Sequence, residues 1–161
     1  DISVKDCAEV PEDFHARYCT KGKEYVYLIT NAPQRDVFFQ KLAYHYPYEL
    51  DIEKMNEAAQ LLVGEHDFAA FCRAEGKARM KSTVREIYSF TAERKEGVCE
   101  LRISGSGFLY NMVRICAGTL IYVSEGKLTP DDIKKALETG DRNYAGKTLP
   151  PEGLYLNEVW Y

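Results

Sequence analysis

One arginine, Arg114, is the only charged residue between Arg102 and Glu125. It stands in the most apolar stretch of the chain, where two adjacent rows of apolar side chains recur at helical spacing. This pattern predicts a helix over 108–123 that is buried on most sides. A guanidinium cannot lose its proton, and burying its charge without a partner is very costly. Arg114 therefore either extends to solvent or meets an anionic group.

The neighbours of Arg114 favour the second alternative. Asn111 and Gly118 share its side of the predicted helix. Gly105 and Gly107 come just before the helix, and glycines permit the close approach of another backbone. We interpret Arg114 as a partnered, functional cation. A side chain that reaches the surface is the alternative, and it is the commoner fate of a lone arginine in a helix.

The one concentrated positive segment of the chain runs from Arg73 to Arg85. Only Glu75 opposes its cations before Glu86, and 74–77 has no apolar periodicity, which predicts a loop. Lysines and arginines on an exposed segment are the groups that contact nucleic-acid phosphates. A charge run that is simply solvated fits the pattern equally well. The cations are Arg73, Lys77, Arg79, Lys81 and Arg85.

The composition describes an ordinary globular protein. A length of 161 residues fits one domain, with 45% hydrophobic and 29% charged residues. No apolar run is long enough to span a bilayer, so we expect no membrane partner. A net charge of −4 and a pI near 5.5 argue mildly against nucleic acid for the chain as a whole. They do not exclude a local basic patch.

Cysteines, histidines and short motifs give no metal site, cofactor site or nucleophile. The five cysteines are widely spaced without a Cys-x-x-Cys pair, so reduced thiols in a cytoplasmic protein are the simplest interpretation. The three histidines have no mutual ligand spacing, and we expect no metal. Gly105-Ser106-Gly107 begins a dinucleotide fingerprint but lacks its third glycine. Neither a P-loop nor a nucleophile elbow is present.

The elements that position these residues alternate between strands and helices. A run of β-branched and aromatic residues predicts a strand over 25–30, and because both of its faces are apolar we expect it at the centre of a sheet. Strands separated by helices but including a hairpin indicate an α+β fold, with helices packed on one face of a mainly antiparallel (mixed) sheet. The other expected elements are strands over 1–5, 84–92, 98–104 and 153–161, helices between Asp51 and Gly64 and between Thr129 and Gly140, a compact turn over 65–71 and a five-residue hairpin loop over 93–97.

Six segments together resemble the C-terminal part of the TruA family of tRNA pseudouridine synthases. Each is weak alone, but six in the family's order at plausible separations are highly specific. They are Phe14-His15-Ala16-Arg17, Lys23-Glu24-Tyr25-Val26-Tyr27, Gly64-Glu65-His66-Asp67-Phe68-Ala69-Ala70-Phe71, Thr83-Val84-Arg85-Glu86-Ile87, the run from Gly105 to Arg114, and Gly153-Leu154-Tyr155-Leu156.

The resemblance implies a pseudouridine-synthase-like fold over 1–161 as a single domain. It also implies an enzyme that isomerises uridine to pseudouridine in the anticodon stem-loop of tRNA, needs no cofactor, and is typically a homodimer. The family's catalytic aspartate lies in a Gly-Arg-Thr-Asp-x-Gly motif upstream of the matched region. This sequence contains no Thr-Asp pair and opens at Asp1 without a Met. We therefore expect the C-terminal half of such an enzyme, carrying one half of the active-site cleft and inactive alone.

The resemblance assigns roles to three positions. Tyr25 corresponds to the active-site tyrosine that stacks against the target base. Arg114 corresponds to the arginine that pairs with the catalytic aspartate, and Leu154 to the apolar residue that packs under the flipped base. The cations of the basic segment, helped by Arg17, would hold backbone phosphates.

Two alternatives stay open from the sequence. A non-catalytic RNA-binding module would keep the fold and the basic segment without the chemistry. A purely structural or dimerisation domain would have no affinity for tRNA even at low salt.

Overall fold

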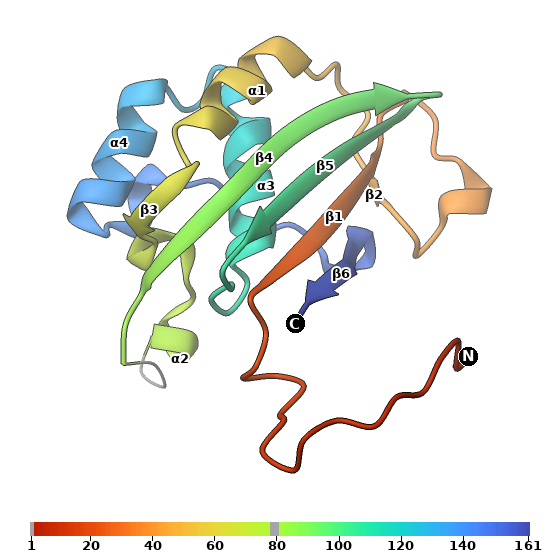
Figure 1. Cartoon of the computed structure of the whole chain (residues 1–161). Coiled ribbons are helices and arrows are strands. Elements are labelled where there is room, and N and C mark those ends of the chain that lie inside the picture. Colours follow the sequence, from red (N-terminus) through yellow and green to blue (C-terminus); the bar gives the residue numbers. More distant parts are fainter. Residues whose placement is uncertain (1, 78–80) are drawn as a thin grey trace.

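A computed structural model of the protein describes residues 2–77 and 81–161. Over these residues, six strands form one mixed sheet. The three longer helices lie against one face of this sheet, and within the described residues the opposite face carries no helix (Figure 1). The expected α+β architecture with helices on one face is confirmed. Within the same residues, no helix is both long and apolar enough to cross a membrane.

The sheet is built around β1, which has neighbours on both sides. The strand order is β2-β1-β5-β4-β3, and β6 also pairs with β1. Every pairing is antiparallel except that of β2, which runs parallel to the end of β1. The central position expected for 25–30 is confirmed. The strands are β1 (Gly22–Thr30), β2 (Tyr44–His45), β3 (Gly64–Asp67), β4 (Val84–Lys95), β5 (Val98–Gly105) and β6 (Leu154–Trp160).

The helices begin and end largely where their capping residues predict. The helix-capping side chain of Asp51 accepts a hydrogen bond from the backbone of Lys54, and Thr129 forms a capping box with Asp132. Gly140 ends the last helix in the left-handed conformation. The helices are α1 (Ile52–Gln60), α2 (Ala74–Lys77), α3 (Met112–Ser124) and α4 (Pro130–Thr139), and short 3-10 turns are η1 (Val37–Phe39), η2 (Ala69–Phe71), η3 (Arg142–Tyr144) and η4 (Pro151–Gly153).

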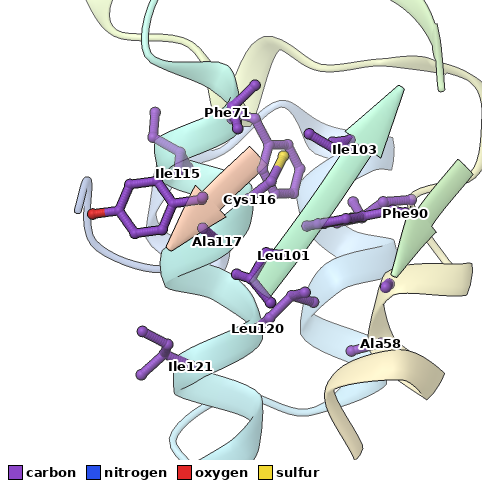
Figure 2. Packing of buried hydrophobic residues seen from close by; sticks show 14 of the residues in the cluster. Ala58, Phe71, Phe90, Leu101, Ile103, Ile115, Cys116, Ala117, Leu120 and Ile121 are labelled. Carbon is purple, nitrogen blue, oxygen red and sulfur yellow. The ribbon is translucent and has the colours of Figure 1, made fainter. Parts of the chain in front are cut away.

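Helix α3 is the centre of the hydrophobic core. Ten of its 13 residues are buried, as the two apolar rows predict. Figure 2 shows Cys116 and Leu120 of α3 on the side of the helix that faces Phe90 of β4 and Leu101 and Ile103 of β5, with Ile115 and Ile121 on its other side. Fully burying one such aliphatic or aromatic side chain contributes about 1.5–3 kcal/mol. The helix therefore has little freedom to shift relative to the sheet.

Helix α3 also contacts the 145–149 segment backbone to backbone. A Cβ atom on Gly118 would lie 2.0 Å from the carbonyl oxygen of Lys147, and one on Gly146 would lie 2.3 Å from the carbonyl oxygen of Gly118. The hydroxyl of Thr119 accepts a hydrogen bond of 2.8 Å from the backbone N–H of Gly146. This contact brings the carbonyl group of Leu149 to the first turn of α3.

The helix expected over 108–123 begins four residues late, at Met112. Asn111 has a φ of +62°, and this left-handed conformation cannot be part of a right-handed helix. The helical spacing of apolar residues includes Phe108 and Leu109 because both pack against the core, but they do so from the non-helical segment that precedes α3.

The expectation of a five-residue hairpin loop over 93–97 is also wrong. Strand β4 continues to Lys95, which pairs with Val98, so the connection is only two residues long. Glu96 and Gly97 both have positive φ values, 47° and 81°, as a type I′ turn requires. Glutamate is unusual at the first position of a type I′ turn, so the sequence did not indicate a two-residue turn here.

Three further expectations differ from the structure. Residues 2–5 form no strand, because their alternating Ile2 and Val4 find no neighbouring strand and are 95% and 81% exposed. The compact turn expected over 65–71 contains the edge strand β3 followed by η2. The loop expected over 74–77 is the one-turn helix α2.

We expect Gly118→Ala to destabilise the protein by about 1–3 kcal/mol, because the added methyl group overlaps the backbone of Lys147. Alanine's better helix propensity, about 1 kcal/mol, offsets part of this loss. Urea unfolding would show a lower midpoint with an unchanged m-value. Gly107→Ala is the control, because a Cβ atom there meets no atom closer than 3.9 Å. Equal midpoints for both variants would contradict the close contact.

Candidate active site

A cavity of about 330 Å³ lies between the start of α3, strand β1 and the start of β6. Its walls come from segments far apart in the chain. Tyr25, Arg114 and Leu154, the three residues singled out in the sequence, all line it, and so does Arg17. The remaining lining residues are Phe108, Leu109, Tyr110, Asn111, Met112, Val113 and Pro151.

Neutral oxygens hold the guanidinium of Arg114. Its Nε donates a hydrogen bond of 2.6 Å to the backbone oxygen of Leu149, and its Nη1 donates one of 2.8 Å to Oδ1 of Asn111. Among residues 2–77 and 81–161, no aspartate or glutamate forms an ion pair with Arg114. The side chain is partly buried. Arg114 thus has a fixed position and a charge that the described residues do not neutralise.

Tyr25 supplies an aromatic ring to the cavity. It comes from β1, and its ring meets that of Phe108 edge-on, with centroids 5.2 Å apart and an interplanar angle of 85°. Burial raises the pKa of the Tyr25 phenol, so the group stays protonated at neutral pH. A protonated phenol offers an uncharged aromatic surface and a hydrogen-bond donor.

Leu154 is placed by close contacts between η4 and β1. The hydroxyl of Tyr27 donates a hydrogen bond of 2.6 Å to the backbone oxygen of Pro150. A Cβ atom on Gly153 would lie 2.5 Å from the backbone oxygen of Leu28, so only glycine lets the chain pass this close. Leu154 then pairs with Tyr27 in the β1–β6 ladder and presents an apolar side chain at the cavity.

The basic segment borders the cavity through Tyr110. The backbone N–H of Arg73 donates to the backbone oxygen of Tyr110 at 3.4 Å, and a Cβ atom on Gly76 would lie 2.6 Å from Cβ of Tyr110. The side chain of Arg85 passes over Gly107, with Nε 3.9 Å from the position of a Cβ atom there. The backbone of the basic segment at Arg73 and Gly76 therefore lies against Tyr110, which lines the cavity.

The remaining cations of this segment are less defined. Lys81 is exposed, and Arg73 forms an exposed ion pair of 3.6 Å with Glu75. Arg79 lies outside the described residues, and so does the side chain of Lys77.

Sequence reasoning missed several groups that shape the site. The backbone oxygen of Leu149 gives no signal, because every residue has one. Tyr110 and Pro151 were not singled out, although a tyrosine inside an apolar motif beside a basic segment could have been. Asn111 was expected on the side of Arg114, and their side chains do meet, although Asn111 precedes helix α3 instead of lying in it.

Comparison with known proteins gives consistent matches. The family model described as tRNA pseudouridine synthase matches residues 58–161. The tRNA pseudouridine synthase A of Geobacillus sp. (strain WCH70) is 47% identical over 161 residues, which cover 100% of this chain and 64% of that protein. The proteins of the same name from Caldicellulosiruptor bescii and Ruminiclostridium cellulolyticum are 47% and 49% identical, with all of this chain and 65% of each relative covered.

The chain thus spans just under two thirds of the length of these relatives. The family model covers the basic segment. It also covers the segment from Phe108 to Arg114 and the start of β6 with the preceding η4, which supply most of the residues that line the cavity. The relatives align with the entire chain, including Arg17 and Tyr25. The chain therefore belongs to the tRNA pseudouridine synthase family.

Proposed function

We propose that this chain is the C-terminal half of a tRNA pseudouridine synthase. It supplies the side of the active-site cleft that carries Tyr25, Arg114 and Leu154, and the catalytic aspartate comes from outside these residues. The observation that carries this proposal is the environment of the Arg114 guanidinium. The guanidinium is held in a cavity by two neutral oxygens and has no carboxylate partner among the described residues.

The proposed reaction changes which atom of the uracil base is bonded to the ribose. The bond between N1 of uracil and C1′ of the ribose breaks, a bond between C5 and C1′ forms, C5 loses its proton and N1 gains one. An enzyme reaches these atoms only after the uridine has left its stack. The cavity offers the extruded base the ring of Tyr25 and the apolar side chain of Leu154.

Arg114 has the electrostatic role. A guanidinium beside a carboxylate lowers the carboxylate's pKa and forms charge-assisted hydrogen bonds with it. The catalytic aspartate would therefore be held ionised and oriented toward the base. Leu149 and Asn111 fix the guanidinium before the aspartate arrives, which reduces the reorganisation needed in the reaction.

The proposed substrate is the anticodon stem-loop of tRNA. The basic segment lies against Tyr110 of the cavity, so phosphates bound by Arg73, Lys81 and Arg85 would lie on the side of the cavity that Tyr110 forms. Lys77, Arg79 and Arg17 are proposed to contribute to the same contact. Homodimerisation of the full-length protein is part of the proposal and rests on the family resemblance.

We expect the full-length protein to release tritium from tRNA labelled at C5 of uridine and the 161-residue chain alone to release none. Arg114→Ala in the full-length protein should lower the single-turnover rate by about 10²–10³-fold, the usual effect of removing one preorganised electrostatic group. Arg94→Ala is the matched control, because Arg94 also donates to a backbone oxygen, that of Leu50, but does not line the cavity.

Two outcomes would contradict this proposal. Turnover by the isolated chain would show that no external aspartate is needed. A full-length protein that binds tRNA without isomerising it would favour the non-catalytic RNA-binding module.

We also expect the exposed cations to bind tRNA electrostatically. Arg73→Gln combined with Lys81→Gln should weaken binding and reduce the slope of log K against log salt by about 0.7–0.9 for each lost phosphate contact. Filter binding between low and moderate salt measures this slope. Lys54→Gln and Lys134→Gln are controls, because these lysines of α1 and α4 are about as exposed as Arg73 and form similar ion pairs, with Asp51 and Asp131, but lie outside the basic segment. A full-length protein without affinity for tRNA at low salt would support a purely structural domain.

A further inference from the structure

We propose that Asn111 is a positioning residue that orients Arg114 while leaving its charge available to a carboxylate. The inference rests on the proposed function. It assigns to Asn111 a role in the chemistry rather than in the stability of helix α3.

Asn111 occupies the capping position of α3 but does not cap the helix. An asparagine at this position ordinarily accepts a hydrogen bond from a backbone N–H of the first helical turn. Here its side chain makes no such bond. Its Oδ1 instead accepts a hydrogen bond of 2.8 Å from Nη1 of Arg114. The side chain therefore does not stabilise the helix end by capping it, and its hydrogen bond orients the guanidinium of Arg114 instead.

The backbone of Asn111 is held in a conformation that costs energy for most residues. Its φ and ψ are +62° and +8°, in the left-handed region. Glycine would satisfy this backbone requirement at lower cost, so the backbone alone does not explain an asparagine. Among non-glycine residues, asparagine tolerates this region well and adds an amide oxygen.

The neutrality of this oxygen matters for the role of Arg114. An aspartate at position 111 would form an ion pair with the guanidinium and neutralise it. The amide of Asn111 and the carbonyl group of Leu149 occupy only two of the five N–H donors. Among residues 2–77 and 81–161, no group accepts a hydrogen bond from Nη2 or from the second N–H of Nη1, so these donors remain for an incoming carboxylate.

The test compares Asn111→Gly and Asn111→Asp in the full-length protein. Both residues tolerate the left-handed backbone, so both variants should fold. We expect single-turnover rates about 10- to 100-fold below wild type in both variants. Asn111→Gly loses one hydrogen bond to a charged group, and Asn111→Asp keeps an acceptor but neutralises the guanidinium. The affinity for tRNA should stay within about twofold, because phosphate contacts and not Asn111 dominate it.

The pH profile separates positioning from structure. Arg114 lowers the pKa of the catalytic carboxylate, so neutralising it in Asn111→Asp should move the acid limb of the rate profile to higher pH. The other ionisable groups that line the cavity are Arg17, Tyr25 and Tyr110, and Tyr27 and, on η4, Glu152 lie nearby. All of them are the same in each variant. Asn111→Gly should move the limb in the same direction by less.

Thr129→Ala is the matched control, because it removes a side chain that does cap a helix. It should lower the unfolding midpoint and leave the rate and the pH profile unchanged. If both Asn111 variants match wild type while Arg114→Ala is inactive, the inference about Asn111 is wrong and the proposed function stands. If wild type releases no tritium from tRNA, the proposed function itself fails.

Discussion

The contact between Gly118 and Gly146 determines the geometry of the site. Because neither residue has a side chain, the backbone of the 145–149 segment lies directly against α3. Helix α3 is itself immobilised by the core side chains of β4 and β5. The carbonyl group of Leu149, which receives Nε of Arg114, thus belongs to a rigid frame that includes the sheet. A guanidinium held in this way loses little further freedom when an anion binds it.

The same frame positions the opposite wall of the cavity. Pro150 follows Leu149 directly, and its backbone oxygen is bound by Tyr27 of β1. Gly153 then passes close to Leu28 before β6 begins at Leu154. One continuous segment of a few residues therefore links the acceptor of Arg114 to the apolar side of the cavity. A shift of this segment would move both together, which couples the electrostatic and the apolar parts of the site.

The sequence could predict residue types and their spacing but not backbone handedness. The central strand, the buried helix and the capped helix α4 followed from periodicity and capping residues. The start of α3 and the hairpin did not, because Asn111 and Glu96 adopt positive φ values that periodicity does not encode. In the site, Arg114 could be found because a lone charge in an apolar helix is conspicuous. The acceptor on Leu149 could not, because it is a backbone atom brought there by tertiary packing.

A second arginine shows that the chain can neutralise such a group with its own carboxylates. Arg102, on the helix-free face of the sheet, forms ion pairs of 2.6 and 2.5 Å with Glu24 and Glu100. The hydrogen bonds that Arg102 donates to these carboxylates, the one to Glu24 first, raise the pKa of Arg102. Arg114 differs in receiving only neutral oxygens. Because leaving a partly buried charge unpaired is costly, this difference supports the proposal that a carboxylate from outside the described residues pairs with Arg114.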